Sequence, residues 1–329
     1  MNRRRLLLAS LAGAATTLTA VLFIWVAQPL IGTPPPIPVP AADAQRLRND
    51  VVRLSGEFGL RHHNRPDVLD KAARFIRDRF AAAGGNAVFQ SYEVNGATYR
   101  NVVGRFGPRV GNPVVVGAHY DAEEHTAGAD DNASGVAGLV ELARLLGQQP
   151  PAVPVELVAY TLEEPPHFRH ATMGSRHHAD ELVAAGSAPR LVVILEMIGC
   201  FYDLPGSQDY PVSLLKAIYP DRGDFIAVIG HMAGTAETRR VKAAMSASAP
   251  LPVWSVNAPA WLPGVDFSDH SSYWRHGIPA VMVTDTAFYR NHRYHRSDDT
   301  PETLDYRRMA HVVSGVVGVI RDSERDRRP

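Results

Sequence analysis

The stretch VVVGAHYD, residues 114–121, and the stretch GADDNASG, residues 128–135, decide the fold of this chain. A β-branched run ends in His119 and Asp121, and a second acid, Asp131, comes ten residues after Asp121. Small residues and an apolar run of helical period follow, so the pattern predicts a buried strand, a loop and a helix. In open α/β sheets, functional sites form at the carboxyl edge of the strands. A histidine and two carboxylates at that edge predict a metal site.

Composition limits the class of protein and the kind of metal site. The chain has 329 residues, of which 45% are apolar, and this is ample for a packed core. Its 34 basic and 34 acidic residues balance, so no basic surface indicates a nucleic-acid partner. The single cysteine, Cys200, excludes an intrachain disulfide and a cysteine-based zinc site. A metal must therefore be held by His, Asp and Glu side chains.

The N-terminus predicts a membrane segment. Three arginines in residues 2–5 precede an uncharged stretch from Leu6 to Ile31, which is long enough to cross a bilayer as a helix. We expect residues 1–32 to form a signal anchor and the Pro-rich residues 33–44 to form a linker. Residues 45–329 then form one catalytic domain outside the cytoplasm, either periplasmic or at the cell surface.

Other interpretations of the N-terminus remain open. Ala42-Asp43-Ala44 resembles a cleavage site, and cleavage there would release a secreted protein. The arginine cluster also resembles a twin-arginine export signal, and a buried N-terminal helix in a soluble protein is a further alternative.

Strand and helix patterns alternate along the rest of the chain, which indicates an α/β fold. The predicted strands cover residues 87–94, 101–106, 114–119, 155–160, 191–195, 225–230 and 280–284. Helical periodicity covers two segments within residues 41–83, the segment after Asn132, and residues 305–321. Asn95-Gly96 between the first two strands is a strong hairpin signal.

Three of these strands end in groups that bind metals. His119 and Asp121 follow the first, Glu163-Glu164 follows the second, and Glu196 ends the third. Buried carboxylates without partners are costly, so their repetition at equivalent strand ends needs an explanation. Two Zn²⁺ ions carry four positive charges, which three carboxylates and one bridging hydroxide would neutralise. Zinc suits nitrogen and oxygen ligands of this kind.

With these motifs, the sequence resembles the clan MH co-catalytic di-zinc exopeptidases of the bacterial aminopeptidase type. Relatives in that clan include glutamate carboxypeptidase, the transferrin receptor and glutaminyl cyclase. The matching motifs are His119-Tyr120-Asp121, residues 128–135, Glu163-Glu164, Leu195-Glu196-Met197 and His295-x-x-x-Asp299-Thr300. They occur in the family's order. The resemblance implies a three-layer sandwich, with a mixed, mostly parallel sheet between helices on both faces.

The resemblance also implies a role for each site residue. Asp131 would bridge two zinc ions, of which one takes Glu164 and His295 and the other takes His119 and Glu196. Glu163 matches the general base. Asp121 matches the group that orients the His119 imidazole. Tyr294 is a candidate donor to the oxyanion of the transition state.

The function that this resemblance implies is a di-zinc aminopeptidase. It would hydrolyse N-terminal residues from peptide substrates through a metal-bridged hydroxide, with Glu163 as the base. One alternative is a glutaminyl-cyclase-like cyclotransferase, which shares the fold and uses a single zinc ion. Another is a non-catalytic, peptidase-like ectodomain, although here every ligand of the motif is present.

Overall fold

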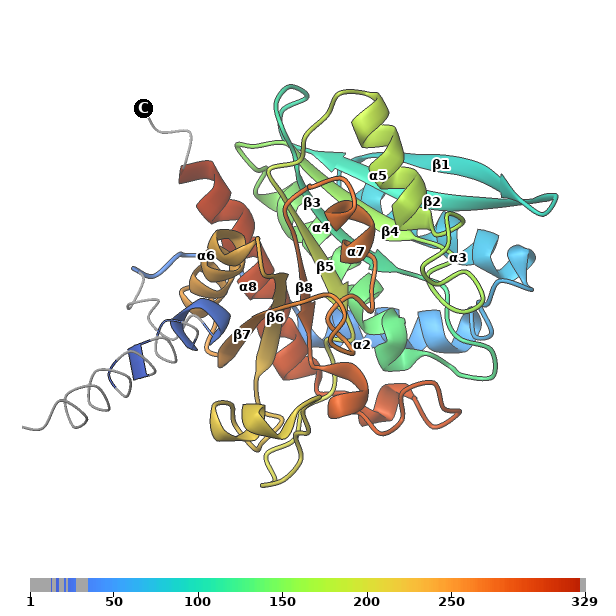
Figure 1. The fold of residues 1–329 in the computed structure, drawn as a ribbon. Coiled ribbons are helices and arrows are strands. Elements are labelled where there is room, and N and C mark those ends of the chain that lie inside the picture. The colour runs from blue at the N-terminus through green and yellow to red at the C-terminus, as the bar shows by residue number, and fades with distance from the viewer. Residues whose placement is uncertain (1–12, 14–15, 18–20, 22, 28–34, 326–329) are drawn as a thin grey trace, which may run out of the picture.

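Strand β3, Val114–His119, lies inside an eight-stranded sheet in the computed structural model, which describes residues 13, 16–17, 21, 23–27 and 35–325 (Figure 1). The strand order is β1-β2-β4-β3-β5-β8-β6-β7. The other strands are β1 (Asn86–Val94), β2 (Ala97–Phe106), β4 (Val155–Tyr160), β5 (Leu191–Glu196), β6 (Ile226–His231), β7 (Val253–Ala258) and β8 (Ala280–Thr284). The central strands β4, β3, β5 and β8 are parallel, whereas β1, β2 and the β6–β8 pair introduce antiparallel contacts.

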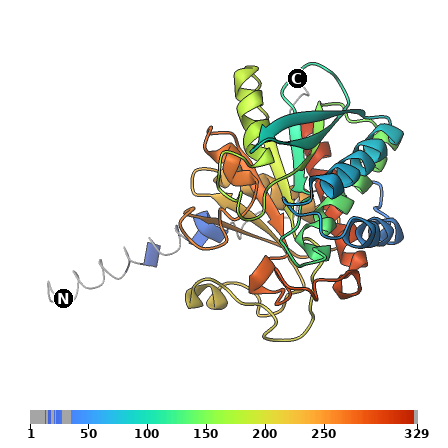
Figure 2. The same cartoon turned by 90° about the vertical axis from the view of Figure 1, so that its right-hand side faces the viewer.

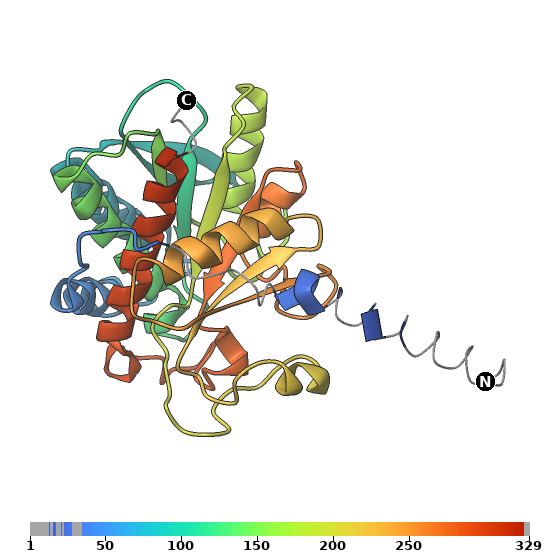
Figure 3. The ribbon, with the colours of Figure 1, turned by 90° about the vertical axis from the view of Figure 1, so that its left-hand side faces the viewer.

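Helices cover both faces of this sheet. One layer contains α2 (Ala44–Val52), α3 (Pro66–Ala82), α4 (Gly135–Gln148), α6 (Thr235–Ser246) and α8 (Tyr306–Arg325). The other contains α5 (Gly174–Ala184) and the short α7 (His270–Trp274). Figure 2 shows α3 and α5 on opposite sides of the sheet, and Figure 3 shows α6 against α8 in the first layer. The predicted α/β sandwich with a mixed, mostly parallel sheet is confirmed.

The apolar run of β3 is continuous because both of its faces are buried. Val114 and Val116 pack into the large core beneath α2, α3, α4 and α8. Val115, between them, packs into a second core with Ala179 of α5 and Tyr273 of α7. Side chains alternate across a strand, so a strand between two helical layers needs apolar residues at every position.

The predicted hairpin is present at β1 and β2. Asn95 and Gly96 both have positive φ angles, +50° and +80°, as a tight two-residue hairpin turn requires. The antiparallel register pairs Val94 with Ala97 across this turn. The hairpin forms one edge of the sheet, and its strand β2 pairs with β4, the strand that precedes Glu163 and Glu164 (Figure 1).

The predicted membrane anchor and the location derived from it need correction. Within the part of the chain that the structure describes, no helix is both long and apolar enough to cross a bilayer. Most of residues 1–32 lie outside the described residues. The Pro-rich segment contacts the domain, because Ile37 is buried in the large core and its N–H donates to the Ala247 carbonyl at 3.0 Å.

We predict that Gly117→Ala destabilises the fold. A Cβ at Gly117 would overlap the buried Tyr160 ring, which is fixed by a 2.6 Å hydrogen bond between its hydroxyl and that of Tyr273. Overpacking of this kind costs about 3 kcal/mol of unfolding free energy, measurable by urea denaturation. Gly56→Ala is the matched control, since a Cβ there meets no atom within 4 Å and no loss is expected. Equal stability of the two variants would contradict this packing.

Candidate metal centre

The Asp131 carboxylate lies between two histidines that are far apart in the sequence. Its Oδ1 is 3.3 Å from Nε2 of His119, and its Oδ2 is 3.2 Å from Nε2 of His295. Asp131 and His119 are buried, and the His295 side chain is 26% exposed. Each carboxylate oxygen therefore faces one histidine.

Two groups of potential metal ligands share this carboxylate. One contains His119, Asp131 and Glu196, and the other contains Asp131, Glu164 and His295; within each group the ligand atoms lie within 4.8 Å of one another. Nε2 of His119 is 3.4 Å from Glu196 Oε1, and Nε2 of His295 is 3.2 Å from Glu164 Oε2. The structure thus brings together the five residues predicted as ligands, in the two sets that the resemblance implied.

Asp121 contacts the His119 ring and the backbone of Glu163 and Glu164. Its Oδ1 accepts the backbone N–H of Glu163 at 3.2 Å, and its Oδ2 accepts that of Glu164 at 3.1 Å. Nδ1 of His119 is 3.1 Å from the Asp121 carbonyl oxygen and 3.6 Å from its carboxylate. A proton on Nδ1 directed at these oxygens leaves Nε2 free to bind a metal. Asp121 therefore orients both the His119 ring and the backbone of the two glutamates.

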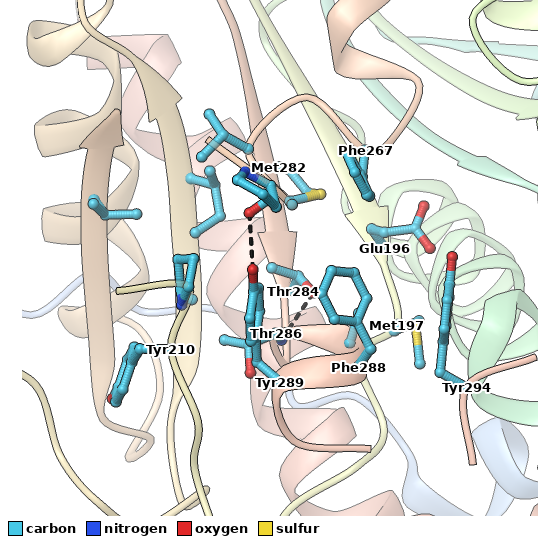
Figure 4. A pocket seen from close by; sticks show the side chains of 18 of the residues that line it. Glu196, Met197, Tyr210, Phe267, Met282, Thr284, Thr286, Phe288, Tyr289 and Tyr294 are labelled. Carbon is cyan, nitrogen blue, oxygen red and sulfur yellow. Dashed lines mark hydrogen bonds between the residues drawn. The ribbon is translucent and has the colours of Figure 1, made fainter. Parts of the chain in front are cut away.

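Glu163 and Tyr294 lie at the edge of the centre. Glu163 Oε2 is 4.0 Å from Nε2 of His119, and Glu163 lines the same cavity as the ligand carboxylates. The Tyr294 ring stacks on His295 with 3.7 Å between ring centroids. Figure 4 shows Tyr294 and Glu196 at the same end of the cavity.

A buried arginine that the sequence analysis missed holds the loop between β3 and Asp131. Arg61 is fully buried and donates to the carbonyl oxygens of Tyr120, Ala127 and Gly128 at 2.8, 2.8 and 2.6 Å. A fourth bond, of 3.1 Å, reaches the Leu54 carbonyl. These bonds use four of the five N–H donors of the guanidinium, and none of them goes to a candidate ligand carboxylate. No motif marks this role, because the partners are backbone atoms distant in the sequence.

Two further side chains that were not assigned roles fix the backbone of Asp131. The Asp299 carboxylate accepts the backbone N–H groups of Asp130 and Asp131 at 3.0 and 3.2 Å. Asn132 donates to the Leu195 carbonyl at 2.8 Å and accepts the Met197 N–H at 3.1 Å. The loop is thus bound to the C-terminal segment and to the end of β5. Ser268 also donates to Glu196 Oε2, at 2.5 Å.

Burial and mutual repulsion shift the pKa values of the acids in the cluster. Burial raises the pKa of Glu163, and it raises the pKa of Glu164 to about 7, with the charge of Asp131 acting in the same direction. Burial also disfavours ionised Asp131, but the nearby His119 and His295 hold its pKa below the ordinary value. Several carboxylates this close cannot all ionise in a buried site unless a cation accompanies them.

The donor set fits a metal ion. Glu164 Oε1 is a buried atom that makes no hydrogen bond, and His295 Nε2 makes none either, although carboxylate oxygens of Asp131 and Glu164 lie 3.2 Å from it. Leaving buried polar atoms without a hydrogen bond is costly. Both atoms belong to residues of the second ligand group. Imidazole nitrogens together with carboxylate oxygens are ligands that suit zinc.

A cavity of about 240 Å³ opens beside the cluster. Glu196 and Tyr294 lie at one end, Phe267 and Phe288 come next, and Met282 lies farther in (Figure 4). The cavity offers a substrate direct access to the carboxylates.

We predict that Asp121→Asn weakens metal binding by about 10–100-fold, because the amide can accept only one of the two N–H groups that the carboxylate accepts. Competition with a chromophoric chelator measures this change. The matched control is Asp180→Asn, since Asp180 is exposed and its 2.6 Å contact is with His276 at the surface. Equal metal affinity of Asp121→Asn and the unmodified chain would show that Asp121 does not orient the ligands.

The chain is similar to known zinc peptidases. The profile of "Peptidase family M28" matches residues 101–320. An uncharacterized Escherichia coli protein, YfbL, is 45% identical over 305 residues, covering 90% of this chain and 93% of its own length.

Solved structures share the fold at low sequence identity. BSAP, a zinc aminopeptidase from Bacillus subtilis, has a TM-score of 0.67 at 14% identity, over 87% of this chain and 96% of its own. A glutaminyl cyclase from Bacteroides thetaiotaomicron has a TM-score of 0.66 at 18% identity, over 86% of this chain and 99% of its own. The matched segment, residues 101–320, covers more than half of the chain and includes all five candidate ligands. The chain belongs to peptidase family M28.

Proposed function

We propose that this protein is an aminopeptidase that uses two zinc ions. The observation that carries the proposal is the position of Asp131, whose two oxygens face His119 and His295 at 3.3 and 3.2 Å. A carboxylate shared by two ligand groups is the arrangement of two-metal hydrolytic sites. Zinc bound at these ligands would polarise the scissile carbonyl and lower the pKa of water.

Glu163 is the residue best placed to move protons. It is buried beside both ligand groups and lies within 4.8 Å of ligand atoms of His119 and Glu164 but, unlike Glu164 and Glu196, it forms no such group with Asp131. Burial raises its pKa, so its carboxylate accepts a proton more readily than an exposed glutamate does. In this proposal Glu163 takes a proton from the attacking water and returns it to the leaving amine.

The lining of the cavity supports attack at the amino terminus of a peptide. No lysine or arginine is among the described residues that line the cavity. A carboxypeptidase needs a cationic group for the terminal carboxylate of its substrate. A free α-amine is instead attracted by the carboxylates at the cluster end, which include Asp131, Glu163 and Glu196.

A glutaminyl-cyclase-like reaction is the second candidate, favoured by the fold that this chain shares with the solved cyclase. Cyclisation of an N-terminal glutamine uses one metal ion and needs no attacking water molecule. The complete second ligand group of Asp131, Glu164 and His295 supports hydrolysis. Mass spectrometry separates the two reactions, because hydrolysis releases a free amino acid and cyclisation releases ammonia from the peptide.

We predict that Glu163→Gln keeps its zinc and loses at least 100-fold in kcat for peptide hydrolysis, because the amide cannot take up a proton. Steady-state kinetics and elemental analysis on the same preparation measure the two effects. Glu181→Gln, at an exposed position of α5, is the control and should be fully active. Substantial turnover by Glu163→Gln would remove Glu163 as the base.

We also predict that His295→Ala lowers bound zinc from about two ions to about one per chain, since one ligand group loses its only imidazole. Inductively coupled plasma mass spectrometry of the dialysed protein measures the stoichiometry. His311→Ala changes a histidine on α8, outside the ligand groups, and should leave the zinc content unchanged. Unchanged zinc in His295→Ala would show that the assignment of this ligand is wrong.

A further inference from the structure

We infer that the apolar end of the cavity binds the side chain of the substrate's N-terminal residue and selects large, uncharged aromatic or aliphatic residues. The inference rests on the proposed aminopeptidase function. It adds the substrate class, which the metal ligands do not determine.

The floor of the cavity is formed by the half of the sheet farthest from the β1–β2 hairpin. Ala227 of β6 pairs with Trp254 of β7 on one side and with Thr284 of β8 on the other. All three residues line the cavity. Because residues opposite one another in adjacent strands project to the same face, the small Ala227 side chain leaves a hollow between its larger neighbours.

A strained turn brings an aromatic residue into the cavity between this hollow and the metal cluster. Thr286 and Ala287 have φ angles of +88° and +49°, a backbone conformation that is costly for residues other than glycine. The Phe288 ring that follows lies 6.1 Å from the Phe267 ring and 5.5 Å from the Tyr294 ring, measured between centroids. Figure 4 shows Phe288 between the Glu196 end and Met282.

Three tyrosines of the lining present their rings to the cavity, because their hydroxyls are already bonded to backbone carbonyls. Tyr219 donates to the Ser255 carbonyl at 2.7 Å, Tyr210 to the Pro220 carbonyl at 2.6 Å, and Tyr289 to the Pro263 carbonyl at 3.1 Å. The last of these bonds is drawn in Figure 4. Hydroxyls satisfied in this way leave little need for a polar group on the substrate side chain.

Charge and size favour the same class of substrate. Among the described residues that line the cavity outside the metal cluster, Asp209 is the one acid, and its carboxylate pairs with Lys216 at 2.9 Å. A charged substrate side chain would therefore lose water without gaining a partner. A cavity of roughly 150 Å³ can hold benzene, and the cavity here measures about 240 Å³. It has room for a phenyl or indole group as well as for leucine.

The test is the hydrolysis of free-amine peptides X-Ala-Ala by the zinc-loaded full chain, where X is Phe, Trp, Leu, Ala, Lys or Glu. We expect kcat/KM for Phe and Leu to exceed that for Ala by about 10–100-fold, because a larger apolar surface is buried. Lys and Glu should rank below Ala. Preference for Ala, Lys or Glu would overturn the inference while leaving the aminopeptidase proposal intact. No release of amino acid from any peptide would overturn both.

Substitutions in the lining test whether this cavity determines the preference for the N-terminal residue. Ala227→Leu fills the hollow and should lower kcat/KM for Phe and Trp at least 10-fold while Ala-Ala-Ala is still hydrolysed. Leu262→Trp narrows the same cavity from a half-buried loop, so it tests the inference even if Ala227→Leu does not fold. Ala184→Leu makes the same change as Ala227→Leu on the exposed end of α5 and should alter nothing. An unchanged Phe-to-Ala ratio in Leu262→Trp or in folded Ala227→Leu would overturn the inference.

Discussion

The site depends on the Asp131 carboxylate, which is buried between two imidazoles and is surrounded by further acids. Burying this group with Glu163, Glu164 and Glu196 is unfavourable unless positive charge is supplied. A pair of divalent ions would supply this charge, with the neutral imidazoles of His119 and His295, which face one Asp131 oxygen each, as further ligands. Much of the surrounding structure is arranged to hold this one side chain.

That support comes from groups that bind backbone rather than metal. Arg61 holds four carbonyl oxygens around the loop that precedes Asp131, Asp299 holds its N–H, and Asn132 joins the loop to the end of β5. Asp121 does the same for the backbone of Glu163 and Glu164. Ligands on loops between rigid strands can keep their positions only when the loop backbone is itself fixed. These bonds fix the loop backbone, and among the candidate ligand carboxylates Glu196 also accepts a side-chain hydrogen bond, from Ser268.

The sequence predicted the strands and candidate ligands that are marked by a pattern of neighbouring residues. Buried strands such as β3 and β5 appear as continuous apolar runs, and the ligands follow directly at their ends. The sequence did not predict β7, because its buried Ser255 and Asn257 interrupt the apolar pattern. Arg61 was missed for a different reason, since its partners are carbonyls up to 67 residues away. The apolar cavity was also beyond prediction, because its walls come from loops and from four strands that only the folded sheet brings together.

Anomalous diffraction from zinc-loaded crystals, recorded on both sides of the zinc absorption edge, tests the two-zinc site most directly. The account predicts two zinc peaks about 3.5–4 Å apart, one on each side of the Asp131 carboxylate. One peak should lie beside His119 and Glu196, and the other beside Glu164 and His295. A single peak under zinc saturation, or two peaks that do not share Asp131, would contradict the account.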